Sequence, residues 1–173
     1  MSRAIDEPND SEVSRLLAGA AKLIESVRYC WLVTRSETGG VNARPMGRVL
    51  PACEQADWKI LFVTYGRSQK ASDIRRADSV ELIFQGDHEE AFGTFAGRAV
   101  LIEDPLAVQR LWKPAYEPNF PEEADRANAA FIEIAVERMK LWIPGVTPEP
   151  FGLRPGILER EAGGGWCVGG SRS

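Results

Sequence analysis

The chain has 173 residues, 44% of them hydrophobic, and its 21 Lys and Arg against 25 Asp and Glu give a formal net charge of −4. This size and composition are typical of one soluble domain, which should bury about 70% of the surface that the unfolded chain exposes. The mildly acidic balance, with no basic run longer than Arg75-Arg76, lacks the electrostatic footprint of a nucleic-acid binder. We therefore expect no nucleic acid as a partner.

The cysteines, the single histidine and the N-terminus exclude several other classes. Cys30, Cys53 and Cys167 are widely spaced without a Cys-x-x-Cys motif, which predicts reduced thiols rather than a disulfide framework or a zinc site. His88 cannot complete a multi-histidine metal site, so no metal is expected. The N-terminus is polar, and no apolar run approaches the roughly 18 residues that span a bilayer. The sequence thus predicts a cytoplasmic protein with no membrane partner.

The first part of the chain predicts a helix followed by three strands. Apolar residues recur with a helical period over residues 13–24, which indicates an amphipathic helix. From residue 29 the sequence turns to β-branched and aromatic residues, which predict a hairpin with arms over 29–35 and about 41–50. A third strand is expected over 58–65.

The second part predicts three more strands and several short helices. Short helices are expected over 68–76, from Asp104-Pro105 onward and over 122–128. Strands are expected over 80–85, 91–102 and 131–137, with 139–142 as an extension of the last. Six mostly antiparallel strands without regular strand–helix alternation favour a small closed β-barrel over a doubly wound parallel sheet.

The end of the chain differs in texture from the rest. Residues 161–173 are rich in glycine, which predicts a flexible tail after a single domain over residues 1–160. Trp166 and Cys167 are unusual residues for a linker, and the sequence does not say where they would dock.

Two polar clusters carry candidate chemistry. In residues 63–70 (VTYGRSQK) a strand end meets a helix start, which supplies hydroxyls, free backbone N–H groups and a cation suited to a phosphate. A serine helix cap followed by solvated Arg and Lys is the structural alternative, and spacing alone does not decide between them. In residues 42–46 (NARPM) the proline marks an edge strand or a bulge, so Arg44 faces either a ligand or solvent.

The two clusters together resemble a known family. The motifs are ARPM in a second strand, WKILFVT, Tyr-x-x-Ser-x-Lys at a helix start, and FAGRAVLIEDP before Leu-Trp. Their order and spacing resemble the pyridoxamine-phosphate-oxidase-like FMN-binding split barrels, and within them the general-stress-protein branch, over about residues 13–142. The resemblance implies a mainly β (α+β) fold, a six-stranded antiparallel split β-barrel with an N-terminal helix and short crossover helices. It also implies a homodimer that binds FMN in a groove at the subunit interface.

The resemblance assigns roles residue by residue. Arg44 and Lys70 would pair with the FMN phosphate, and Ser68 and Thr64 would hydrogen-bond around it. Trp112 would lie near the ring system, or else in the core, and Trp142 has the same two alternatives. The backbone of the two strand segments would line the flavin, so the implied cofactor-binding residues are Arg44, Pro45, Met46, Val63, Thr64, Tyr65, Ser68, Lys70 and Trp112.

Departures from the family pattern leave the reaction open. Gln69 stands where the pyridoxamine-phosphate oxidases proper carry Arg, Val49 stands where they carry Lys, and their C-terminal substrate segment is not recognisable here. The resemblance therefore implies an NAD(P)H-linked oxidoreductase acting on an unidentified small-molecule substrate, with no catalytic acid or base assigned. The alternatives are a non-catalytic flavin-binding or stress-protection protein, a flavin-free interaction module, and a deazaflavin or haem in place of FMN. The lone His88 disfavours haem.

Overall fold

The computed structural model describes residues 7–47, 57–86, 88 and 90–170. The end of the predicted second strand, together with Val49 and Cys53, lies outside the described residues. No helix in the described part of the chain combines the length and the apolar character needed to cross a membrane.

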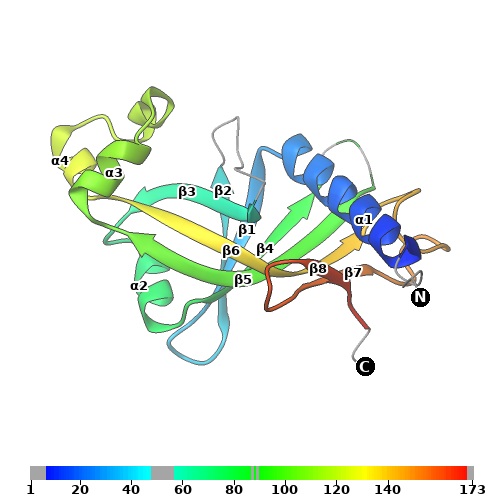
Figure 1. Cartoon of the computed structure of the whole chain (residues 1–173). Helices are drawn as coiled ribbons and strands as arrows, with labels where there is room; N and C mark the ends of the chain where they lie inside the picture. Colours follow the sequence, from blue (N-terminus) through cyan, green and yellow to red (C-terminus); the bar gives the residue numbers. More distant parts are fainter. Residues whose placement is uncertain (1–6, 48–56, 87, 89, 171–173) are drawn as a thin grey trace.

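The described residues form one antiparallel sheet of eight strands at the centre of the molecule (Figure 1). Neighbouring strands follow the order β2-β1-β4-β5-β6-β7-β8, and β3 pairs with β6 outside this path. The strands are β1 (Tyr29–Arg35), β2 (Val41–Gly47), β3 (Lys59–Tyr65), β4 (Ser79–Gln85), β5 (Phe92–Ile102), β6 (Ala129–Trp142), β7 (Gly156–Arg160) and β8 (Trp166–Val168). β6 has 14 residues, so its first half can pair with β3 and its second half with β7.

The predicted mainly β, antiparallel architecture is confirmed, but the count of six strands is wrong. β7 and β8 are the additional strands, and the pairing of the described strands does not close into a ring. The strands from β1 to β6 fall where the sequence predicts them, and in β1, β3 and β4 every second residue is buried in the core.

The predicted flexible tail is wrong for residues 161–170, because a hairpin crosses the expected boundary at residue 160. Gly164 adopts a φ of 89°, a conformation that glycine reaches without strain, in the turn between β7 and β8. Trp166 then packs edge-on against Trp58, with ring centroids 6.0 Å apart, and the Arg160 guanidinium lies 5.7 Å from the Trp166 ring centroid. The contact between Trp166 and Trp58 and the pairing of β7 with β8 hold this segment in place despite its glycine content.

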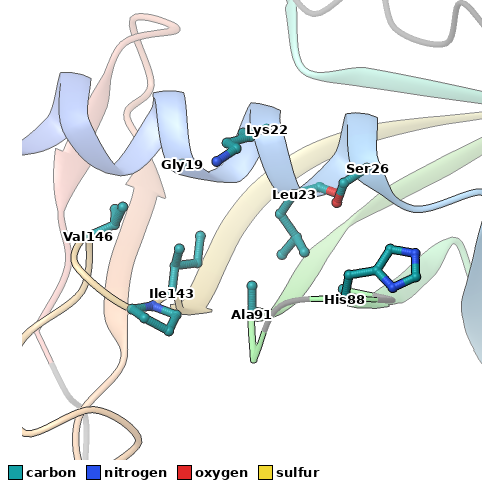
Figure 2. A pocket seen from close by; sticks show the side chains of 10 residues that line it. Gly19, Lys22, Leu23, Ser26, His88, Ala91, Ile143 and Val146 are labelled. Carbon is teal, nitrogen blue, oxygen red and sulfur yellow. The ribbon is translucent and has the colours of Figure 1, made fainter.

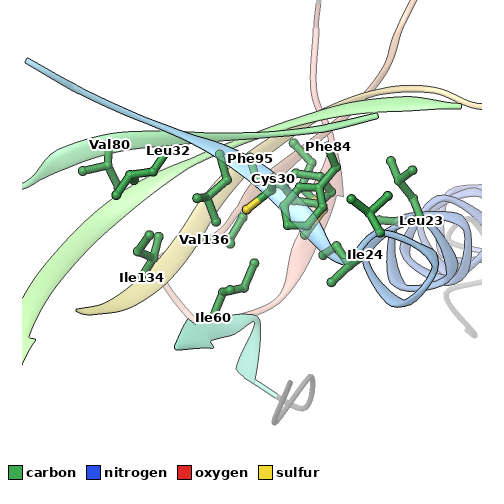
Figure 3. Packing of buried hydrophobic residues seen from close by; sticks show 14 of the residues in the cluster. Leu23, Ile24, Cys30, Leu32, Ile60, Val80, Phe84, Phe95, Ile134 and Val136 are labelled. Carbon is green, nitrogen blue, oxygen red and sulfur yellow. The ribbon is translucent and has the colours of Figure 1, made fainter. Parts of the chain in front are cut away.

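Helix α1 (Glu7–Ser26) covers one part of the sheet and confirms the predicted amphipathic helix (Figure 1). It begins before the predicted start of the periodic segment. Its apolar stripe contributes buried residues such as Leu16, Leu23 and Ile24 to the main core. Figure 3 shows Leu23 and Ile24 beside the strand residues Phe84 and Phe95. Burial of side chains of this size stabilises the fold by about 1.5–3 kcal/mol each.

Four short helical segments connect the later strands. They are α2 (Gln69–Arg76), α3 (Pro105–Leu111), the 3-10 helix η2 (Pro114–Asn119) and α4 (Glu123–Ala127). Ser68 and Asp104 cap α2 and α3 as predicted, since each side chain accepts a backbone N–H of the first turn. Figure 1 shows α3 and α4 at the end of the sheet away from both chain termini. There Val108, Tyr116 and Phe120 form a second small core with the start of β6.

Candidate functional site

A groove of about 710 Å³ follows strands β2 and β3 and is bordered by the starts of β1 and α2 and by η2. This volume lies in the range of about 300–1,000 Å³ that is typical of ligand sites. Six of the nine predicted cofactor-binding residues line it, namely Pro45, Met46, Val63, Thr64, Tyr65 and Lys70. The fold therefore brings together two segments that are separated in the sequence, because β2 and β3 border the same groove.

The charge of the groove has one sign. Among the described residues that line it, Arg28 and Lys70 are the charged ones, and both are cations. The Arg28 guanidinium lies 5.3 Å from the centroid of the Tyr29 ring, at the end of the groove formed by β1 and Gly47. These two cations favour an anionic ligand in the groove although the chain as a whole has a net charge of −4.

Lys70 occupies the other end of the groove, in the first turn of α2. Burial is the main cause that lowers the pKa of the Lys70 ammonium, and the positive charge of Arg44 lowers it further. The two predicted phosphate ligands are therefore close enough to repel each other. A dianionic group placed beside them would neutralise that repulsion.

Arg44 is not among the residues that line the groove, and its guanidinium is hydrogen-bonded to two other side chains. Its Nη1 donates a hydrogen bond to Thr34 Oγ1 at 2.7 Å, and its Nη2 donates to Asp73 Oδ2 at 3.2 Å. The side chain of Arg44 keeps 20% of its surface exposed. Sequence reasoning anticipated Arg44 but neither of these two partners.

Asp73 is the site residue that the sequence analysis missed. Its side chain is fully buried, and it accepts hydrogen bonds from Thr34 Oγ1 at 2.7 Å, from Asn42 Nδ2 at 3.0 Å and from Gln69 Nε2 at 3.1 Å. Burial on its own raises the pKa of Asp73, but the hydrogen bonds from Asn42, Thr34, Gln69 and Arg44 outweigh it and hold the pKa well below its usual range. The signal that could have revealed it is its position between Ala71 and Ile74, on the buried face of α2.

Ser68 caps α2, as the structural alternative predicted, and its hydroxyl also lies near that of Thr64. Ser68 is the N-cap of α2, with its Oγ 3.4 Å from the backbone nitrogen of Ala71, and its hydroxyl lies 3.3 Å from that of Thr64. Thr64 is buried at the floor of the groove. The hydroxyl pair thus joins the end of β3 to the start of α2 at the Lys70 end of the groove.

Trp112 is not brought together with the other predicted residues. It packs in the second core, with ring-centroid distances of 5.7 Å to Tyr116 and 5.5 Å to Phe120, and it lines a separate pocket of about 460 Å³. Phe120 is the link between the two regions, because it also lines the groove and lies 4.6 Å from the Tyr65 ring. Trp142 lies opposite Phe92 at the far end of β6.

A third pocket, of about 240 Å³, lies beside α1 (Figure 2). Leu23, Ile143 and Val146 give it an apolar wall, and the exposed His88 lies at one side (Figure 2). None of the predicted cofactor-binding residues lines it. Among the described residues, no three His, Cys, Asp or Glu side chains come together in a way that could hold a metal ion. The cationic groove is therefore the candidate site.

An antiparallel sheet with short helices and a cationic groove along two strands defines an α+β protein with a candidate site for an anionic ligand. The sequence matches the family described as "Pyridoxamine 5'-phosphate oxidase like" over residues 17–146. This match spans well over half of the chain, and the chain belongs to that family. No curated protein matches the sequence significantly.

Solved structures share the fold. A protein related to general stress protein 26, from Clostridium acetobutylicum, superimposes with a TM-score of 0.69 at 17% identity, covering 84% of this chain and 94% of its own. A pyridoxamine 5'-phosphate oxidase-related, FMN-binding protein from Nostoc punctiforme has a TM-score of 0.62 at 17% identity and covers 97% of both chains. An F420 reductase has a TM-score of 0.51 at 16% identity, covering 68% of this chain and 93% of its own. The resemblance predicted from the sequence motifs is confirmed.

Proposed function

We propose that this protein binds FMN noncovalently in the cationic groove and that it does so as a homodimer. The observation that carries the proposal is the Lys70 end of the groove, where an ammonium, two hydroxyls and the start of a helix converge next to Arg44. Charge-assisted hydrogen bonds of this type are the strong ones for a phosphate. The shared fold with an FMN-binding protein supports the same assignment.

The residues present fit the two parts of FMN. Lys70 and the exposed part of Arg44 would hold the phosphate, with the Thr64 and Ser68 hydroxyls beside them. Apolar and aromatic surface from Met46, Val63 and Tyr65 continues along the groove and suits a flavin ring. The Tyr65 hydroxyl donates to the carbonyl oxygen of Asn119 at 3.0 Å, which attaches η2 to the edge of the groove.

An exposed apolar face next to the groove supports the homodimer. Trp31 on β1 lies opposite Pro45 of β2 on one side and Ile83 of β4 on the other, and it is 51% exposed. Val41 and Tyr29 are exposed on the same face, and Tyr29 and Pro45 also line the groove. Contiguous exposed apolar residues mark interaction surfaces. We propose that a second copy of the chain covers this face and closes the groove.

Within this proposal the protein is an oxidoreductase that passes electrons from a reduced nicotinamide to a small acceptor. When bound, the cofactor supplies the redox chemistry, and the chain binds, orients and shields it. The described residues that line the groove include no carboxylate and no histidine, so no proton-transfer residue is assigned. Storage or protection of the flavin is the competing function.

Three measurements test the proposal. Purified protein should be yellow, and the released flavin should co-migrate with FMN; colourless protein that takes up no added FMN would refute flavin binding. The shared fold with an F420 reductase makes the deazaflavin the direct competitor. Tighter binding of the deazaflavin than of FMN would overturn the choice of cofactor. Anaerobic mixing with NADH or NADPH then distinguishes an enzyme from a storage protein. An enzyme should speed the reduction of the bound flavin, seen as bleaching, well above the rate for free FMN, and a storage protein should not.

A further inference from the structure

A buried carboxylate connects the parts of the site that the sequence keeps apart. Asp73 lies on α2, the helix that also carries Lys70, and its side chain has no exposed surface. Its Oδ2 accepts hydrogen bonds from Thr34 of β1 and from Asn42 and Arg44 of β2. One oxygen atom therefore joins two strands and a helix.

Two hydrogen bonds within the chain restrict the orientation of the Arg44 guanidinium. Of the five N–H donors of a guanidinium, one at Nη1 meets Thr34 Oγ1 and one at Nη2 meets Asp73 Oδ2. Thr34 acts as a bridge, because its hydroxyl accepts from Arg44 and donates to Asp73. The 20% of the Arg44 side chain that remains exposed belongs to a group whose orientation is already determined.

We propose that Asp73 is a positioning residue that, together with Thr34, holds the Arg44 guanidinium in place beside Lys70 so that both cations meet the same phosphate. This inference rests on the proposed binding of FMN in the groove. Because α2 also carries Lys70, the same carboxylate determines where the two cations stand relative to each other. A preorganised pair loses less conformational entropy on binding than two free side chains would.

A role in the fold alone is the alternative. Asp73 also accepts hydrogen bonds from Gln69 and Arg76 of its own helix, so it braces α2 whether or not a ligand binds. The two roles differ in their ligand dependence. Loss of a structural brace would weaken the binding of every ligand in the groove, whereas loss of positioning would weaken only the binding of a ligand that carries the phosphate.

The test compares FMN with riboflavin, which lacks the phosphate. Asp73→Asn keeps the shape of the side chain but places an N–H₂ group where an acceptor is needed, because both carboxylate oxygens accept hydrogen bonds. We expect its dissociation constant for FMN to rise by about tenfold or more, with riboflavin affinity unchanged within about twofold. Asp78→Asn is the matched control, since it removes the same charge from an exposed aspartate that pairs with Arg98 outside the groove.

Thr34→Val keeps the test decisive if Asp73→Asn fails to fold. It removes the bridging hydroxyl but leaves every charge in place. We expect FMN binding to weaken by about three- to tenfold, again without a change for riboflavin. Equal losses of FMN and riboflavin in a folded variant, or no loss of FMN in either variant, would overturn the positioning role. Wild-type protein that binds neither flavin would instead refute the proposed function, and the inference with it.

Discussion

Replacement of Lys70 by alanine tests the phosphate end of the groove most directly. Lys70 is partly buried in the first turn of α2, and none of its contacts is an ion pair with a described carboxylate. Burial and the charge of Arg44 lower the pKa of Lys70, so the charged ammonium slightly destabilises the protein when no ligand is bound. We therefore expect Lys70→Ala to fold normally, with a change in unfolding free energy within about 0.5 kcal/mol.

The affinity for FMN should fall instead. A charge-assisted hydrogen bond to phosphate contributes about 1.5–3 kcal/mol, which corresponds to weaker binding by about ten- to a hundredfold. Quenching of flavin fluorescence during titration of the apo-protein measures this change. Riboflavin should bind to the wild type and to Lys70→Ala almost equally.

The matched control is Lys113→Ala, which removes the same charge from an exposed residue at the start of η2 that does not line the groove. It should leave both affinities within about twofold of the wild type. If Lys70→Ala lost riboflavin as strongly as FMN, Lys70 would shape the pocket rather than bind the phosphate, and the assignment would be refuted. An equal loss of FMN in Lys113→Ala would show a general effect of net charge.

Three further predictions follow from the same structure. The affinity for FMN should fall as the pH rises toward the pKa of Lys70, which is lowered from its ordinary value of 10.5, because the protonated ammonium is the form that binds phosphate. Titrations between about pH 7 and 10 should show this loss of affinity in the wild type and not in Lys70→Ala. Trp31→Glu should convert the proposed dimer to a monomer in sedimentation experiments, whereas Leu153→Glu, at an exposed residue of a separate loop, should leave it a dimer. A Trp31→Glu protein that stays dimeric would place the interface elsewhere. Gly97→Ala should lower the unfolding free energy, measured by urea denaturation, by about 2 kcal/mol or more, because the added Cβ would stand 2.1 Å from the carbonyl oxygen of Ala135. Gly40→Ala should change it much less, because the nearest atom to the added Cβ is 3.5 Å away.

Local patterns predicted most of the fold because most elements here are determined locally. Strands β1, β3 and β4 are short runs rich in β-branched and aromatic residues in which every second residue is buried, and Ser68 and Asp104 begin helices by capping them. β7 and β8 could not be predicted in the same way. Their pairing depends on β6 being long enough to serve two neighbours, and on Trp166 reaching Trp58, more than 100 residues earlier in the chain. A glycine run shows only that the backbone can adopt many conformations, and tertiary contacts decide whether it is held in one of them.

The site was predictable as two segments but not as a unit. The family resemblance assigned Arg44 and Lys70 the same role, as ligands of the FMN phosphate. In the structure they are not equivalent, since Arg44 is paired with the buried Asp73 and Lys70 has no such partner among the described carboxylates. The Arg44–Asp73 pair is close to neutral at long range, so Lys70 and Arg28, the two cations that line the groove, supply the charge that attracts an anion. In this proposal Arg44 contributes mainly directed hydrogen bonds, and the buried Asp73 of α2 determines where those bonds point.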